Sequence, residues 1–350
     1  MIEIERPRRQ GRIPYRLLSL LVSGVLLAAC VALMYQRIDW RDVAAVWTNL
    51  NPYLVVLAAL LYWLQYPANS YRLQHVIAWS VERASFAAPS FRFLFRLTCS
   101  SAFVAVAAPI GLAGDAAKIA ALRLFGGLSI TESARCAVFD RVVGLQSIAI
   151  VGLLTIPLQV AAGVGWSVVA LQLTFFGGIV AGVCALIVFP RLLALIPHDL
   201  GRRLTRMVAG YRTFITPRRL AIQTSISLLN NLCAWGTLYF LLRAADLDMN
   251  PWIVGGFVPF LQVVNGLPFL YMGWGGREIA MAATIGATGH LSLNETLAVS
   301  MAWGVVLIAT GAVNGLFLIG DWQTTGQTQG GDRAPERGAA PPLGIDQHRP

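Results

Sequence analysis

Apolar runs about as long as a membrane is thick dominate this sequence. A helix needs about 20 apolar residues to cross the hydrocarbon core of a bilayer. Such runs recur between residues 17 and 320, and no gap between them is long enough for a soluble domain. Only 13% of the residues are charged, whereas soluble domains carry about 25%. The sequence therefore predicts an all-α polytopic membrane protein.

Six runs have the length and the low charge of full spans. They cover residues 17–35, 52–71, 142–162, 167–189, 220–242 and 297–320. The first run follows several arginines but is long for the apolar part of a signal peptide, so we expect an uncleaved span. We expect a basic N-terminus at 1–16, one transmembrane domain at 17–322 and a disordered polar tail at 323–350.

The arginines predict the orientation of these spans, because cytoplasmic loops are enriched in basic residues. Arginine is concentrated in segments 1–16, 72–96 and 191–219, whereas the turn at 245–251 has two aspartates and no basic residue. We therefore expect a bacterial inner-membrane protein with both termini in the cytoplasm. Arg72, at the end of a predicted span, is interpreted as an orientation anchor.

Segment 97–141 must then begin and end in the cytoplasm, because spans 142–162 and 167–189 together make one excursion. It holds one short apolar run, 97–112, followed by polar sequence. A re-entrant hairpin satisfies both conditions if its break falls at Pro109, Gly111 and Gly114. Such irregular backbone is tolerated at membrane depth only inside protein or beside a wet cavity.

A second broken element follows in the other half of the chain. Segment 252–272 is apolar but ends at the glycines of 273–276, and a short helix is expected at 277–289. This element would enter from the periplasm. Broken helices at matching positions in two halves point to a transporter site. We therefore predict six full spans, two re-entrant broken-helix hairpins and an inverted repeat.

The first break carries an expected anion site. A glycine-rich break that opens a helix exposes backbone N–H groups, which attract anions together with the helix dipole. Asp115 can cap this helix, and Lys118 and Arg123 add positive charge nearby. The alternative is a plain loop before a capped helix. The predicted substrate-binding residues here are Pro109, Gly111, Gly114, Asp115, Lys118 and Arg123.

The second break repeats this pattern with Gly275, Gly276, Arg277 and Glu278. Charges between apolar runs are costly unless they are paired or face water. The alternative is a structural salt bridge that closes the helix start. Asp140 and Arg141, at the head of span 142–162, are added to the candidate site, although such a pair can also be a simple interfacial anchor.

The sequence shows no pattern of an enzyme centre. Its five cysteines and four histidines are scattered without metal-ligand spacing, and it has no nucleotide-binding loop. We therefore expect no metal, no cofactor and no enzymatic activity. The net charge of +10 is explained by membrane orientation, so we expect no nucleic-acid partner.

The order of these motifs resembles the lysylphosphatidylglycerol synthase transmembrane-region family of flippase-like proteins, over residues 72–322. The resemblance rests on the first glycine break with Asp115, on Leu122-Arg123, on Asp140-Arg141-Val-Val-Gly144-Leu145, on Pro268 and on Gly275-Gly276-Arg277-Glu278. The sequence departs from the family pattern where Ala113 splits the first glycine pair and where Lys118 replaces an expected arginine.

The resemblance implies a bacterial or archaeal lipid flippase. The type member also carries a soluble aminoacyl-transferase domain, and stand-alone relatives are linked to hopanoid or glycolipid export. Because this sequence ends in a short polar tail, we expect only the flippase-like half. The leading hypothesis is a translocase for an anionic or glycosylated lipid. The alternatives are a membrane-embedded lipid-linked transferase, with Asp115 and Asp140 as candidate bases, and a non-catalytic partner of a lipid or envelope-glycan synthase.

Overall fold

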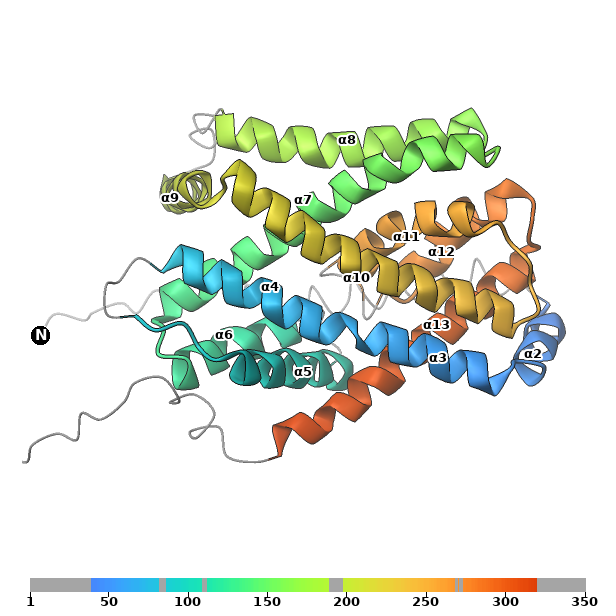
Figure 1. The fold of residues 1–350 in the computed structure, drawn as a ribbon, viewed down its shortest axis with the longest axis horizontal. Coiled ribbons are helices and arrows are strands. Elements are labelled where there is room, and N and C mark those ends of the chain that lie inside the picture. The colour runs from blue at the N-terminus through green and yellow to red at the C-terminus, as the bar shows by residue number, and fades with distance from the viewer. Residues whose placement is uncertain are drawn as a thin grey trace, which may run out of the picture.

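The computed structural model describes residues 39–81, 86–108, 112–188, 198–267, 270 and 273–319. These residues form helices and no strand. Most of the helices lie roughly along the long axis of the molecule (Figure 1). The predicted span at 17–35, the basic segment at 1–16 and the tail at 323–350 lie outside the described residues.

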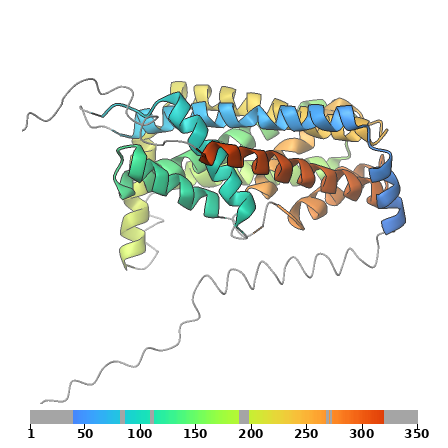
Figure 2. The ribbon, with the colours of Figure 1, turned by 90° about the horizontal axis from the view of Figure 1, so that it is seen from below.

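The described chain begins with a sharp bend. Helix α2 (Trp40–Thr48) is followed at a 90° bend by α3 (Pro52–Trp63) and α4 (Gln65–Ser80). Asn51 caps α3, with Pro52 in the first helical position, where proline is favoured. Trp47 of α2 donates a hydrogen bond of 3.1 Å to the carbonyl of Ala298, so α2 packs against the start of α13 (Leu293–Val313) at one end of the bundle (Figure 2).

Helices α5 (Phe91–Ala107) and α6 (Ala113–Phe125) form a hairpin that starts at the other end of the bundle. Both stop near the middle of the long axis (Figure 1). Their approach is close, because a Cβ added at Gly114 would lie 2.7 Å from the carbonyl oxygen of Ser101. Helix α5 ends at Ala107 and α6 begins at Ala113, so the interruption falls within the predicted segment, but Gly114 lies in the first turn of α6 and not in the break.

Helix α7 (Ile130–Ala161) is longer than the predicted span at 142–162. It begins at a capping box in which Ser129 and Glu132 satisfy each other's backbone N–H groups. Asp140 and Arg141 therefore lie inside the helix, and the prediction that they head a span is wrong. The sequence indicates only that the residues before 142 are polar, whereas in the structure two of these polar residues, Ser133 and Asp140, are buried.

Helix α8 (Trp166–Val188) packs on α7 at the outside of the bundle (Figure 1). It is attached by a reciprocal amide pair. Gln159 and Gln172 donate to each other at 2.8 and 2.9 Å, and both side chains are fully buried. Gln159 is also 3.4 Å from the carbonyl of Gly256. The pair thus joins α7 and α8 to α11 (Pro251–Asn265).

The second half adds α9 (His198–Phe214), α10 (Pro217–Ala244) and α12 (Gly276–Ala283), besides α11 and α13. Short 3-10 turns cover Gly286–Thr288 and Asn314–Leu318. Figure 1 shows α11 and α12 entering from the end opposite to α5 and α6. Helix α11 ends at Asn265, seven residues before the predicted end of the apolar segment at 272, whereas α12 begins at Gly276, close to the predicted start at 277.

Four helical segments are long and apolar enough to cross a membrane: Ile130–Ala161, Trp166–Ala185, Pro217–Ala244 and Leu293–Leu318. A fifth is obtained if Trp40–Thr48 and the bent continuation Pro52–Ser80 count as one span. The described helices are thus those of a multi-pass membrane protein. The count of six spans stays a prediction, as do the insertion of the hairpins into a bilayer and the inverted repeat.

The buried apolar side chains form two clusters. One lies around α10, α11 and α13 and includes Leu238, Phe257 and Trp303, and the other lies around α4, α5, α7 and α9 and includes Ile77, Phe93 and Phe139. The segments of α4, α7 and α10 between or beside these clusters carry buried polar side chains. The candidate site lies in this polar region.

Candidate functional site

The first ion-pair group joins three helices around Asp140. Arg72 of α4 donates from Nε to Asp140 Oδ1 at 2.9 Å, and Lys118 Nζ of α6 lies 3.6 Å from Asp140 Oδ2. All three side chains are largely buried. A Cβ added at Gly144 would lie 3.2 Å from Nη1 of Arg72. Gly144, one helical turn after Asp140, therefore leaves room for the arginine head group.

Arg141 makes the second ion pair of this group. Its guanidinium contacts the Asp115 carboxylate in the first turn of α6, and its Nη1 donates to the carbonyl of Gly266 at 3.2 Å. Gly266 follows the last residue of α11. Arg141 thus contacts both broken elements, and its side chain remains 45% exposed, so part of it is open to a ligand.

This charge cluster of Arg72, Asp115, Lys118, Asp140 and Arg141 has an excess of positive charge. Three cations against two carboxylates leave a net charge of +1. No side chain of the described residues caps the N-terminus of α6. The N–H groups of its first turn therefore add partial positive charge beside Arg141. Such an arrangement favours an anionic ligand.

Other predicted residues of the first site have different positions. Gly114 packs tightly against α5, so its lack of a side chain is required for helix packing. Arg123 is exposed in the last turn of α6, about 12 Å along the helix from Asp115 at 1.5 Å per residue. Pro109 and Gly111 lie outside the described residues.

At the second break, Arg277 and Glu278 form a buried ion pair with each other. Arg277 Nη2 lies 2.9 Å from Glu278 Oε1, and Ser300 of α13 donates to the same oxygen at 2.8 Å. The other carboxylate oxygen accepts the N–H of Gly275 at 2.6 Å and so caps α12. Gly275 has a φ of +81°, a conformation that suits glycine. Arg277 is completely buried, with its guanidinium 5.1 Å from the ring centre of Trp274.

The two buried arginines are accommodated in the same way. A Cβ at Gly304 of α13 would lie 2.5 Å from Arg277 Nη2, just as Gly144 makes room for Arg72. The two breaks differ in access, however. The first has an exposed arginine and a helix start without a side-chain cap, whereas the second is enclosed and capped.

A layer of amide side chains lies beside the charge cluster and was not predicted. Asn230 of α10 donates to Asn69 of α4 at 3.3 Å, and Gln262 of α11 donates to Asn231 of α10 at 3.3 Å. Both amide atoms of the fully buried Gln223 have no hydrogen-bond partner among the described residues. Leaving a buried polar group unpaired costs about 1–3 kcal/mol, which marks this layer as unusual.

The sequence does contain signals for this layer. Gln65, Asn69 and Arg72 recur at the spacing of one helix face. Ser227 and Asn230 continue a similar face from Gln223. These polar residues lie within or beside the apolar runs and could have shown that Arg72 faces the interior.

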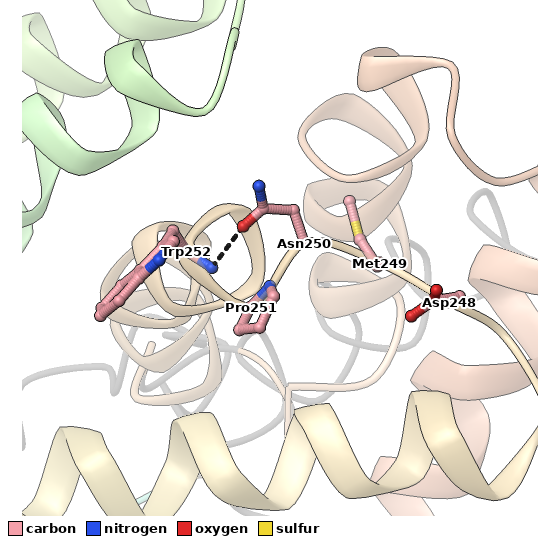
Figure 3. A pocket seen from close by; sticks show the side chains of 5 residues that line it. All are labelled: Asp248, Met249, Asn250, Pro251 and Trp252. Carbon is pink, nitrogen blue, oxygen red and sulfur yellow. Dashed lines mark hydrogen bonds between the residues drawn. The ribbon is translucent and has the colours of Figure 1, made fainter.

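An open pocket of about 430 Å³ lies elsewhere, at the turn between α10 and α11 (Figure 3). Its lining residues are Asp248, Met249, Asn250, Pro251 and Trp252. The Asn250 side chain accepts the N–H of Trp252 at 3.0 Å and so caps α11. The lining has no basic residue, so this pocket is not suited to an anionic headgroup. The described residues also contain no group of three or more His, Cys, Asp or Glu side chains that could hold a metal ion.

Apolar helices, two broken elements and a buried charge cluster together define a multi-pass integral membrane protein with polar groups at its centre. The sequence model of the lysylphosphatidylglycerol synthase TM region matches residues 16–316. The chain therefore belongs to this family, as the motifs had indicated. A comparison with curated proteins finds no match.

Proposed function

We propose that this protein moves an anionic or glycosylated lipid between the leaflets of a membrane. The observation that carries the proposal is the charge cluster at the start of α6. There Arg72, Lys118 and Arg141 outnumber the carboxylates they contact, and Arg141 is partly exposed. A phosphate at this place would meet both the guanidinium of Arg141 and the positive end of α6.

The contacts of Arg141 suggest how the two broken elements cooperate. Its single side chain reaches Asp115 of α6 and the carbonyl of Gly266 after α11. A headgroup phosphate that competes for the guanidinium would weaken one or both contacts. The two elements would then separate and let the headgroup pass. We propose that an ion gradient or the lipid gradient itself drives this movement.

We also propose the bacterial inner membrane as its location, with both termini in the cytoplasm. The packing is consistent with this orientation. Arg219 lies 5.4 Å from the ring centre of Trp79, so the arginine-rich start of α10 adjoins the end of α4. At the other end the N–H of Asn51 donates to the carbonyl of Ala244 at 2.9 Å. The end of α4 and the start of α10, both expected in the cytoplasm, thus lie together.

The transferase alternative needs a carboxylate that can accept a proton. Asp140 contacts Arg72 and Lys118, and Asp115 contacts Arg141. Both carboxylates therefore already hold cationic partners, and neither is free to contact a substrate hydroxyl. This pairing supports the choice of a binding role for the charge cluster over a catalytic one.

Transport can be measured with the purified chain in liposomes. Fluorescent phosphatidylglycerol is incorporated in both leaflets, and dithionite added outside bleaches only the outer one. We expect the protein to let dithionite bleach the inner-leaflet lipid, and we expect Lys118→Met to reduce this strongly. Asp140 still forms its ion pair with Arg72 in that variant, so we expect the protein to fold. Arg243→Gln, in an exposed ion pair with Asp248, is the matched control.

The proposal would be contradicted if the wild-type protein left the inner-leaflet probe protected from dithionite with both anionic and glycosylated probe lipids. Equal activity of the Lys118→Met variant and the wild type would remove the charge cluster from the transport route. The melting temperature of each variant in detergent shows whether a loss of transport reflects unfolding.

A further inference from the structure

The amide layer adjoins the charge cluster on more than one side. It consists of Gln65, Asn69, Gln223, Asn230, Asn231 and Gln262. Asn69 lies one helical turn before Arg72, which pairs with Asp140. Gln262 lies about one turn before Gly266, whose carbonyl accepts from Arg141. The amides of α4, α10 and α11 and the charges of α4, α6 and α7 therefore form one connected polar region.

The packing of α4 on α10 extends this region along both helices. The α3–α4 segment runs antiparallel to α10, because Asn51 before α3 contacts Ala244 at one end and Trp79 of α4 lies beside Arg219 at the other. The bond between Asn69 and Asn230 sets their register. Ser227, about one turn before Asn230, therefore lies near the level of Arg72, and Gln223 lies one turn beyond it.

The hydrogen bonds of the layer are incomplete within the described part of the chain. Both amide atoms of Gln223, Nε2 of Gln65 and Oδ1 of Asn230 have no partner there, and all three residues are at least nine-tenths buried. Unpaired buried amides destabilise the fold, and here four such atoms lie on adjacent faces of α4 and α10. Donors and acceptors are thus available to a ligand that reaches the centre of the bundle.

The chemistry of the layer restricts the ligand. An amide can donate to and accept from a hydroxyl group, whereas a phosphate offers only acceptors. The two carboxylates of the charge cluster are already paired with arginine or lysine. They leave no free negative charge for a cationic headgroup. The polar region as a whole suits a negative charge next to neutral hydroxyl groups.

We propose that the amide layer binds the hydroxyl groups of the lipid headgroup. The substrate class is then a lipid with an anionic phosphodiester and a neutral polyol or sugar headgroup. This inference rests on the proposed function, because it takes the charge cluster as the phosphate site. It adds a second site that selects the headgroup.

The wild-type protein can be tested with three short-chain lipids of matched tails. Dioctanoyl phosphatidylglycerol has one negative charge and two headgroup hydroxyls. Dioctanoyl phosphatidylethanol has the same charge and no hydroxyl, and dioctanoyl phosphatidylethanolamine adds a cation. Binding of each to the full chain in mild detergent is measured by native mass spectrometry. We expect phosphatidylglycerol to bind about tenfold more tightly than phosphatidylethanol, since a site built for hydroxyls discriminates against their loss, and phosphatidylethanolamine to bind most weakly.

The outcomes separate this inference from the proposed function. Equal binding of phosphatidylglycerol and phosphatidylethanol would overturn the inference and leave an anion site intact. Tightest binding of phosphatidylethanolamine would also overturn it. If no anionic lipid binds, the phosphate site fails and the proposed function fails with it.

Variants of the layer test the residues themselves. In Gln223→Met an unpaired amide is replaced by an apolar side chain of similar length. We expect an equal or higher melting temperature without lipid and the loss of the tenfold preference for phosphatidylglycerol. Asn230→Leu should lose the same preference. Ser133→Ala removes a buried hydroxyl outside the layer that has no partner among the described residues, and this variant should keep the preference. If both layer variants keep the preference for phosphatidylglycerol over phosphatidylethanol, the amides are only structural. If either variant fails to fold, the binding of the three lipids to the wild-type protein still tests the inference.

Discussion

Arg141 and Asp115 form an ion pair that attaches the middle of α7 to the first turn of α6. The same arginine donates to the carbonyl of Gly266 at the end of α11. The two broken elements enter the bundle from opposite ends (Figure 1), and Arg141 contacts both where they meet. A movement of one broken element would therefore change the contact of Arg141 with the other.

Replacing Arg141 by lysine tests this coupling. Lysine retains the charge but cannot present the planar fork that reaches two acceptors at once. We expect transport of fluorescent phosphatidylglycerol to fall about tenfold, a loss in the range that misplaced groups cause. Stability should fall by less than about 1 kcal/mol, because the pair is partly exposed. Arg243→Lys is the control, and an unchanged transport rate in Arg141→Lys would argue against coupling.

Variants of Gly114 distinguish two explanations for the glycine, namely close helix packing and access of an anion to the backbone. The sequence suggested that it lets an anion approach the backbone, whereas the structure places Ser101 O 2.7 Å from an added Cβ. We expect Gly114→Ala to lower the unfolding free energy by about 1–3 kcal/mol, and Gly114→Leu to prevent folding. Gly178→Ala on α8, where an added Cβ meets open space, should be neutral or slightly stabilising. A Gly114→Ala variant of normal stability that has lost lipid binding would instead support the approach of an anion to the backbone.

The orientation of the chain can be tested with single cysteines. Cys184 is exposed, while Cys99, Cys136 and Cys233 are buried. Cys30 lies outside the described residues, so Cys30→Ser combined with Cys184→Ser gives a suitable background. We expect a cysteine at Asp248 to react with a membrane-impermeant maleimide from the periplasm. Cysteines at Gln10 and Gln327 should react only after the membrane is opened. Any other pattern would contradict the proposed orientation.

The broken elements were predictable because glycine and proline interrupt helices by a local mechanism. The breaks before α6 and α12 are therefore visible in the sequence itself. The start of α7 was missed for a different reason. Its polar residues did not fit an apolar span, and only tertiary packing shows that Asp140 is buried against Arg72 and Lys118.

Arg72 shows that the position of an arginine in the sequence does not always indicate the orientation of a span. An arginine near the end of an apolar run is usually a cytoplasmic anchor. Here the helix continues to Ser80, so Arg72 lies in its interior. The space that it fills is left by Gly144 on another helix. A contact between residues so far apart in the sequence cannot be deduced from the spacing of either one.

Arg277 and Glu278 form a buried ion pair at the start of α12. Arg277→Met alone leaves the buried carboxylate without its cation, and removing one partner of a buried pair typically costs about 3–5 kcal/mol. Arg277→Met combined with Glu278→Gln removes both charges, and the glutamine can still accept the N–H of Gly275. We therefore expect the single variant to unfold at a clearly lower temperature and the double variant to recover most of the loss.

Transport by the double variant then distinguishes a clamp from a ligand site. The sequence alone suggested that Arg277 binds a headgroup, which predicts a stable double variant without transport. In the structure Arg277 is fully buried against Glu278, Ser300 and Trp274. Because a lipid would have to displace these contacts, we expect the double variant to transport at a rate near that of the wild type. A folded double variant without transport would instead return Arg277 to the binding site, and the enclosed state would then be one of two states in the transport cycle.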